Sequence, residues 1–246
     1  MEDAAMYNEY VKVEHHEGWA EMILDRPERR NALIGPMIEQ LTHTVRMLGM
    51  DDSVQAIVFR GAGGCFSSGH DLKELQLEPR PAWALSLGRI FREANIALFE
   101  FPKPIVGALE GYAINAGAAL ALSCDILIAG ESAVLQVGEI QQGAGVANNV
   151  AWLRLRAGEA AASRIVLYGE RIPAAELHRL GLTSEVVPDA DVLARARIVA
   201  ARLAGFPPGS PARIKAAVRA QSGIIDPREW FTVQSSAALL SANKVS

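Results

Sequence analysis

Cysteines are scarce in this sequence, and clustered metal ligands are missing. The chain of 246 residues has two cysteines, Cys65 and Cys124, and no basic start of the kind that opens a secretion signal, so we predict no disulfide. Its five histidines are scattered and form neither HExxH nor a Cys/His ligand spacing. We therefore predict no metal site.

An excess of basic charge and a long apolar run are also missing. The formal net charge of -4 provides no electrostatic footprint for nucleic acid or an anionic membrane surface. No stretch reaches the roughly 18 apolar residues of a membrane span. Half of the residues are apolar and 21% are charged, which is typical of a soluble globular protein. We predict a cytoplasmic protein whose partners are neither nucleic acids nor membranes.

The first half of the sequence alternates apolar strands with amphipathic helices. The pattern predicts a hairpin over 9–16 and 19–24, helices from Pro36 to about Met50 and over 81–101, strands over 56–59, 105–109, 126–129 and 133–137, and a short helix between Asn115 and Asp125. In the helix over 81–101, Leu85, Ile90, Phe91, Ala94 and Leu98 are predicted to lie on one side. Continuous apolar strands between helices favour a partly parallel sheet covered by helices.

After Gly138 the pattern becomes predominantly helical. Helices are predicted over 150–155, 158–167, 173–180, 189–203, 211–221 and 227–240, with a rigid break at Pro207–Pro211. The sequence therefore predicts an α/β core followed by a helical C-terminal region.

Two glycine-rich turns share one arrangement of strand, turn and polar helix start. They are the stretches 61–74 and 110–119, each following an apolar strand. The first N–H groups of a helix have no partner within the helix, so they can bind an anion or a polarised carbonyl. Two such turns can together form a two-donor oxyanion hole. A dinucleotide fingerprint is excluded because Phe66 replaces the third glycine of GxGxxG.

Six motifs in order resemble the crotonase superfamily, which includes the enoyl-CoA hydratases and isomerases. They cover residues 24–33, 61–74, 102–113, 124–129, 169–176 and 180–182. The resemblance implies an α/β, crotonase-like (ClpP/crotonase) fold, a spiral of ββα units with a helical C-terminal region. It also implies a spiral core over residues 1–200, a helical oligomerisation region over 201–246, and a homotrimer or dimer of trimers. Coenzyme A is expected as part of an acyl-CoA thioester substrate, with no separate cofactor.

The resemblance also assigns the binding residues. The backbone N–H groups of His70 and Ala116 match the donors that hold the thioester oxygen and stabilise an enolate. Ser68 and the segment His70, Asp71, Leu72 and Lys73 match the stretch that contacts coenzyme A. By charge and position, Arg26 and Arg30 are either contacts to the coenzyme A phosphates or solvated charges on a turn. The imidazole of His70 either takes part in the chemistry or belongs to a surface loop.

The side chains that move protons set the reaction. Family hydratases use two carboxylates, because water must lose one proton while the α-carbon gains another. The first position is Ala119 in this chain, and the second is Glu139. A single glutamate suffices to shift a double bond between the 3,4 and 2,3 positions, so Glu139 is the predicted catalytic base. A carboxylate kept only for hydrogen bonding or helix capping is the other interpretation.

Two more departures from the family pattern leave alternatives open. Asn148 and Asn149 replace a usual Thr-Gln pair, and they either bind a polar acyl group or cap the following helix. The chain ends at Lys244–Ser246 without the usual aromatic-rich segment. The leading hypothesis is an enoyl-CoA isomerase. The alternatives are a hydratase of weak or altered activity, a non-catalytic acyl-CoA binding protein, and a protein that acts on acyl groups attached to a carrier protein.

Overall fold

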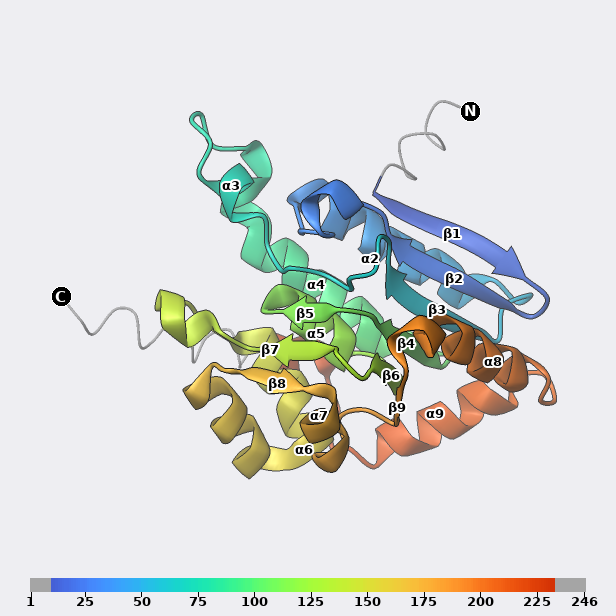
Figure 1. The fold of residues 1–246 in the computed structure, drawn as a ribbon. Coiled ribbons are helices and arrows are strands. Elements are labelled where there is room, and N and C mark those ends of the chain that lie inside the picture. The colour runs from blue at the N-terminus through green and yellow to red at the C-terminus, as the bar shows by residue number, and fades with distance from the viewer. Residues whose placement is uncertain (1–9, 233–246) are drawn as a thin grey trace, which may run out of the picture.

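The fold contains a main sheet of six strands and a smaller sheet of three. In this computed structural model, which describes residues 10–232, the main sheet has the order β1-β2-β3-β4-β6-β9 (Figure 1). Its strands are β1 (Val11–His16), β2 (Trp19–Leu24), β3 (Ala56–Gly61), β4 (Ile105–Leu109), β6 (Ile126–Gly130) and β9 (Glu185–Val187). Only β1 and β2 pair antiparallel, and every other pair in this sheet is parallel.

The smaller sheet gives the fold its spiral form. It contains β5 (Tyr112–Ile114), β7 (Val134–Gln136) and β8 (Arg171–Pro173). The chain leaves β4 for β5 and leaves β6 for β7, so it alternates between the two sheets. Isolated parallel bridges join Leu33 to His70 and Ser67 to Ala113, which extends this pairing to the glycine-rich turn. The expected crotonase-like spiral of ββα units is therefore confirmed.

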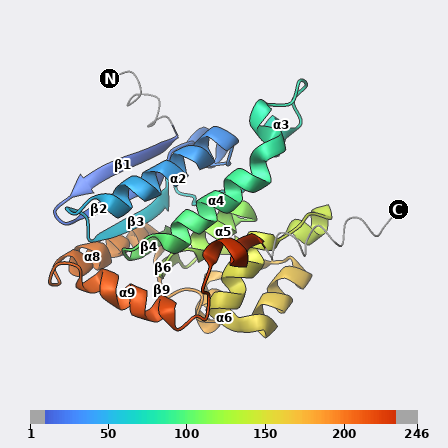
Figure 2. The same cartoon turned by 180° about the vertical axis from the view of Figure 1, so that it is seen from behind.

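Helices cover both faces of the main sheet. The helices are α2 (Gly35–Met50), α3 (Leu72–Leu75), α4 (Leu87–Glu100), α5 (Ala116–Leu122), α6 (Ala147–Tyr168), α7 (Ala174–Arg179), α8 (Val192–Ala204) and α9 (Ser210–Ala220). The view from behind shows α2 and α4 lying across one face, while α8 lies against the other (Figure 2). Side chains alternate along a strand, so Ile57 and Phe59 pack on the α2 and α4 side and Val58 packs toward α8. Burial of both faces explains the continuous apolar strands.

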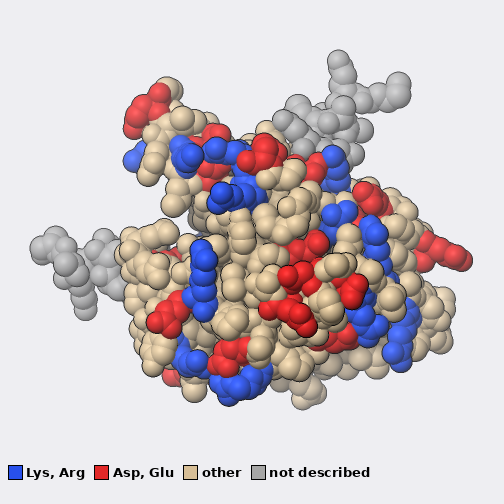
Figure 3. All heavy atoms as spheres, viewed as in Figure 1, with Lys and Arg blue, Asp and Glu red and all other residues tan. Residues whose placement is uncertain are grey.

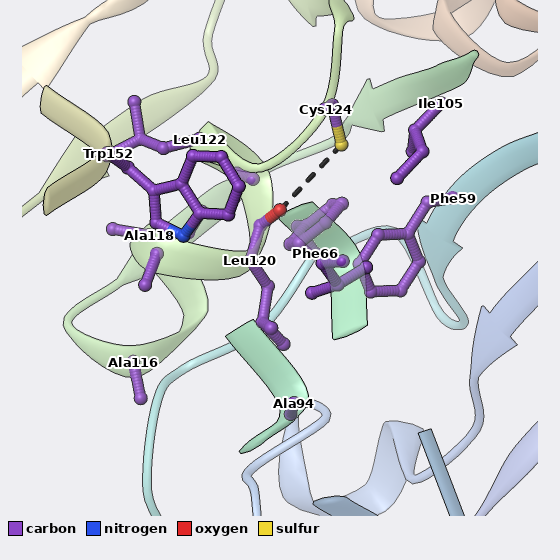
Figure 4. Close-up of a cluster of buried hydrophobic side chains, with 14 of the residues drawn as sticks. Phe59, Phe66, Ala94, Ile105, Ala116, Ala118, Leu120, Leu122, Cys124 and Trp152 are labelled. Carbon is purple, nitrogen blue, oxygen red and sulfur yellow. Dashed lines mark hydrogen bonds between the residues drawn. The ribbon is translucent and has the colours of Figure 1, made fainter. Parts of the chain in front are cut away.

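Helix α5 is buried along its whole length. All seven of its residues are buried, and Leu120 and Leu122 extend into the core beside Phe66 and Trp152 (Figure 4). The many alanines allow this helix to approach its neighbours closely. Trp152 donates its indole N–H to Asn95 Oδ1 at 2.7 Å, which satisfies a buried polar group. The start of α5 therefore belongs to the buried core of the molecule.

The expected elements differ from the observed ones mainly in the short strands. Strands β5, β8 and β9 were not predicted, because each has only three residues and pairs with a segment distant in sequence. Residues 82–86 form a 3-10 helix, so Leu85 lies outside α4 and is 94% exposed, while Ile90, Phe91, Ala94 and Leu98 on α4 are buried. The break predicted between 155 and 158 is present, because Gly158 is non-helical inside α6.

The C-terminal part packs on the main sheet through α8 and contacts Phe99 and Trp152 through Arg219 of α9. The predicted boundary at residue 200 falls inside α8. Helix α9 is joined to the core because Lys215 and Arg219 both pair with Asp125. The chain is helical again over 227–232, and the rest of the helix predicted over 227–240 lies outside the described residues. Over residues 10–232, no helix is long and apolar enough to cross a membrane.

Candidate active site

A cavity of about 1050 Å³ opens between the two glycine-rich turns and the start of α6. Its walls come from the first turns of α4, residues 114–116, Glu139 with residues 142–149, and four residues of the first glycine-rich turn and α3, namely Ser68, His70, Leu72 and Leu75. Figure 3 shows basic and acidic side chains interspersed on the face that carries a hollow below the projection around α3. The lining residues named above come from four separate parts of the chain, which the fold brings together.

Asn31 holds the first glycine-rich turn in place. Its side chain is fully buried and donates to the carbonyls of Ala62 and Cys65, both at 2.8 Å. Gly61 must be glycine, because a Cβ at this position would lie 2.1 Å from the carbonyl oxygen of Cys65. The motif over 24–33 thus has a structural role, which is to position the turn that carries His70.

His70 and Ala116 line the cavity, and their backbone N–H groups have no partner within residues 10–232. The bridge between Leu33 and His70 uses the amide of Asp71 and the carbonyl of Gly69, which leaves the N–H of His70 free. Ala116 is the first residue of α5, where no intrahelical acceptor exists. Neither amide has an acceptor within residues 10–232. A Cβ on Gly69 would lie 3.5 Å from the nitrogen of Ala116, so the two turns are in contact.

Asn115 precedes α5 in a strained backbone conformation. Its φ of 52° and ψ of -114° are rare for a residue other than glycine, at a cost of about 1–3 kcal/mol. Three hydrogen bonds compensate for this strain. Its N–H donates to the carbonyl of Gln136, its Oδ1 accepts from the N–H of Gly138, and its carbonyl accepts from Asn149 Nδ2. The start of α5 is therefore tied to the segment that carries Glu139.

Glu139 is a buried carboxyl group in the cavity wall. It begins the 3-10 helix η3 (Glu139–Gln142) and is only 9% exposed. Its Oε1 accepts from Asn149 Nδ2 at 2.9 Å, while Oε2 is buried with no partner among the described residues. Burial raises the pKa of Glu139 to about 7, although the hydrogen bond from Asn149 opposes this shift. A carboxyl group with such a pKa can both accept and return a proton near neutral pH.

Asn149 joins the two halves of the site. The same Nδ2 donates to Glu139 and to the carbonyl of Asn115, so one amide group spans both segments. The capping interpretation is wrong for this residue, because α6 begins after Val146 without any side-chain cap. The Oδ1 atoms of Asn148 and Asn149 are buried with no partner within residues 10–232. Asn148 therefore presents an unsatisfied polar group at the cavity.

The imidazole of His70 lines the cavity and does not belong to an exposed loop. It packs edge-on against Phe91 with ring centroids 5.0 Å apart, and its Nδ1 is buried with no partner in the described part of the chain. Burial lowers the pKa of His70 to about 4. The imidazole is therefore neutral at pH 7 and adds no positive charge beside the two amides.

The predicted coenzyme A contacts fall into two groups. Arg26 is buried and donates to Asp71 Oδ2 at 3.0 Å, so it is neither a solvated charge nor an open phosphate contact. Asp71 also accepts from Arg29 and caps α3 through the N–H of Glu74. The other predicted contacts lie nearer to solvent. Arg30 and Lys73 are exposed, and Ser68 and Leu72 line the cavity.

Within residues 10–232, potential metal ligands come together at one place, which lies outside this cavity. Glu14, His16 and Glu21 have ligand atoms within 4.8 Å of one another in the β1–β2 hairpin. The carboxylate of Glu21 already accepts hydrogen bonds from Arg60 at 2.7 Å and from Arg197 at 2.6 Å. Both oxygens of the Glu21 carboxylate are therefore already paired with guanidinium groups.

Two features of the site were not predicted from the sequence, the contact between Asn115 and Asn149 and the position of two arginines. Asn115 and Asn149 contact each other across 34 residues of sequence, a contact that local patterns do not reveal. Arg89 and Arg92 extend into the cavity from α4. The sequence contained a sign of this arrangement, because the two arginines lie one helical turn apart, beside the apolar residues of α4, and so belong to one face of the helix.

Comparison with known proteins identifies the class that this fold and site define. The spiral of two alternating sheets is shared with an enoyl-CoA hydratase/isomerase from Xanthobacter autotrophicus Py2. That crystal structure matches with a TM-score of 0.81 and 32% identity, covering 94% of this chain and 85% of the other. The protein is thus a member of the crotonase-fold class. A family model described as "Enoyl-CoA hydratase/isomerase" matches residues 14–234. The chain belongs to the enoyl-CoA hydratase/isomerase family of acyl-CoA enzymes.

Relatives in this family carry out more than one reaction. The chain is 32% identical to the 2,3-dehydroadipyl-CoA hydratase of Escherichia coli strain K12, over 86% of this chain and 85% of that protein. It is 31% identical to the 1,2-epoxyphenylacetyl-CoA isomerase of the same organism, over 89% and 85% of the two chains. Similarity at this level establishes the family and does not select between hydration and isomerisation.

Proposed function

We propose that this enzyme isomerises the double bond of an enoyl-CoA thioester, with Glu139 as its single base. The observation that carries the proposal is the composition of the cavity wall. Among the described residues that line the cavity, Glu139 is the only one with a carboxyl group. The position where family hydratases carry their other carboxylate is Ala119, which is fully buried in α5.

The proposed reaction uses the two halves of the site in sequence. The thioester oxygen of a 3-enoyl-CoA accepts hydrogen bonds from the N–H groups of His70 and Ala116. Ionised Glu139 then removes a proton from the α-carbon, and the electron pair moves into a dienolate whose oxygen is held by these two donors. The protonated Glu139 returns the proton at the γ-carbon, which leaves the conjugated 2-enoyl-CoA. Coenzyme A enters and leaves as part of the thioester.

The electrostatics of the cavity support this assignment of roles. A base must be partly ionised at the working pH, and a pKa of about 7 satisfies this requirement for Glu139. Its Oε2 has no partner within residues 10–232, so it is free to take a proton. The imidazole of His70 is neutral at pH 7, so in the proposed reaction the backbone N–H groups stabilise the oxyanion without a positive charge from this side chain.

Replacement of Glu139 by glutamine tests the proposal. The wild-type enzyme is expected to convert 3-hexenoyl-CoA into its conjugated 2-enoyl isomer, followed by absorbance. Glu139→Gln should lower kcat by about 10²- to 10⁴-fold, since it removes the base and keeps the shape of the side chain. Thioester binding measured by calorimetry should remain. Glu131→Gln, at an exposed residue, is the matched control. Isomerisation that survives in Glu139→Gln would contradict the proposal.

Hydration is the second candidate, and the hydratase among the relatives favours it. Glu139 would then activate water for addition to a 2-enoyl-CoA, and the α-carbon would need another proton donor. Loss of the conjugated absorbance of crotonyl-CoA at a rate that depends on Glu139 would support this reaction. Binding of thioesters without turnover of any enoyl-CoA would instead indicate a non-catalytic binding protein.

A further inference from the structure

Two arginines in the cavity have no acidic partner. Arg89 and Arg92 lie one turn apart near the start of α4, and both line the cavity that contains Glu139. Neither forms an ion pair or a side-chain hydrogen bond with any residue in the range 10–232. The next residue, Glu93, points elsewhere and pairs with Arg46 and Arg228. Arg89 and Arg92, on the cavity side of α4, therefore differ from the neighbouring Glu93, whose charge is paired.

The charge balance of this cavity favours an anionic ligand. Its lining includes two guanidinium groups and a single carboxyl group, that of Glu139. Since the pKa of Glu139 is about 7, that carboxyl group carries only part of a negative charge at neutral pH. The buried Oδ1 of Asn148 and Nδ1 of His70 add polar groups that no described residue satisfies. Such unsatisfied groups are unusual in a cavity wall unless a polar ligand completes them.

We propose that the acyl group of the substrate ends in a carboxylate, which Arg92 and Arg89 bind at the α4 side of the cavity. Guanidinium groups suit a carboxylate because their planar N–H donors match its two oxygens. Arg92 is half-buried and Arg89 is exposed, so Arg92 makes the stronger contact. This inference rests on the proposed function, because it names the acyl group on which Glu139 acts.

The phosphates of coenzyme A are the other anions that these arginines could contact. The two sources predict different behaviour across substrates. A phosphate contact contributes equally to every coenzyme A thioester, whereas a contact to the acyl terminus contributes only when that terminus carries a carboxylate. A pair of thioesters that differ only at the acyl terminus therefore separates them.

The test compares 3-hexenoyl-CoA with its carboxylated analogue, 3-hexenedioyl-CoA. Wild-type enzyme is expected to prefer the carboxylated thioester by about tenfold in kcat/KM. Arg92→Gln should raise KM for that thioester by about 10- to 100-fold and leave KM for 3-hexenoyl-CoA unchanged, because a charge-assisted hydrogen bond is lost. Arg92→Lys should restore only part of the loss, because lysine lacks the paired donors. Arg46→Gln, which removes a charge outside the cavity, should leave both values unchanged.

Each other result has a defined meaning. Equal increases in KM for the two thioesters, or weaker binding of free coenzyme A to Arg92→Gln, would assign the arginines to the phosphates and overturn the inference. No effect of Arg92→Gln on the carboxylated thioester would also overturn it. If calorimetry shows Arg92-dependent binding of 3-hexenedioyl-CoA and no thioester is isomerised, the inference stands while the proposed function fails.

Discussion

The two walls of the cavity are built by different means. We call residues 67–71 with 114–117 the backbone wall, and Glu139, Asn148 and Asn149 with Arg89 and Arg92 the side-chain wall. In the backbone wall the chain packs against itself, as where Gly117 lies against Ser67, and its free donors are main-chain N–H groups. In the side-chain wall, buried side-chain oxygens have no partner among the described residues.

This difference indicates how the site divides its work. A backbone wall positions donors regardless of which side chains surround it, so it suits the thioester that all substrates of the family share. A side-chain wall changes with a single substitution, so it suits the roles proposed for it, which are to set the reaction and to select the acyl group. Asn149 connects the two walls. Its Nδ2 donates to Glu139 in the side-chain wall and to the carbonyl of Asn115 in the backbone wall.

Damage to the backbone wall should have the largest effect. Gly69 has a φ of +88°, and a Cβ there would lie 2.7 Å from the carbonyl oxygen of Ile114. Gly69→Ala must therefore push the N–H of His70 away from that of Ala116. We expect kcat to fall by at least about 10²-fold, the usual cost of misplacing a catalytic group by about 1 Å. Steady-state assays of the isomerisation will measure this loss.

The matched control is Gly205→Ala. The nearest atom to a Cβ at Gly205 is 3.5 Å away, and its φ of -76° is ordinary for alanine. Near-native thermal unfolding of Gly69→Ala would show that the fold survives. Full activity in a folded Gly69→Ala enzyme would mean that the spacing of the two amides does not matter, and the comparison of the two walls would then fail.

A second prediction concerns the stability cost of Glu139. Its pKa is about 7 in the folded protein against an ordinary value of 4.5, so the folded state keeps a proton that the unfolded state releases. Its contribution is fully present below pH 4.5 and is lost as the pH rises to about 7. From pH 5 to pH 8, the wild type should lose up to about 3 kcal/mol of unfolding free energy relative to Glu139→Gln.

Urea unfolding at several pH values provides the measurement. Glu159→Gln replaces an exposed carboxylate on α6 and should show the same pH dependence as the wild type. Parallel curves for the wild type and Glu139→Gln would show that Glu139 is ionised without cost. Glu139 would then lack the raised pKa that suits a group that accepts and returns a proton near pH 7.

The sequence predicted the backbone wall better than the side-chain wall for a physical reason. Local patterns marked the two glycine-rich turns, because a strand followed by glycine and a helix start is written in consecutive residues. The amides of His70 and Ala116 were assigned within those turns by the family resemblance. Glu139 was found through its place in a family motif. Arg26 was misjudged because its partner Asp71 lies 45 residues away, and such pairing is decided only by the fold.

The helices and strands show the same difference between features marked by local sequence and features set by distant pairing. Helix α2 was expected from Pro36 to about Met50 and spans Gly35–Met50, since its apolar spacing is regular and a proline marks its first turn. Strand β8 was missed because Arg171–Pro173 has three residues and contains a proline, which resembles the start of the next helix. Its strand character comes from pairing with β7, where Leu135 faces Ile172. The cytoplasmic location and the homotrimer stay predictions.

The smallest expected effect arises at Asn149, the residue that connects the walls. Its hydrogen bond lowers the pKa of Glu139, so Asn149→Ala should raise that pKa further. The rise of kcat/KM with pH, expected near pH 7 in the wild type, should move to higher pH in this variant. We expect about a tenfold loss at pH 7, with part of the activity recovered at pH 9.

Asn148→Ala is the matched control. The side-chain Oδ1 of Asn148 has no partner among the described residues, so this substitution should leave the midpoint unchanged. A tenfold loss that is the same at every pH would mean that Asn149 acts by supporting the strained backbone of Asn115 and does not tune the base.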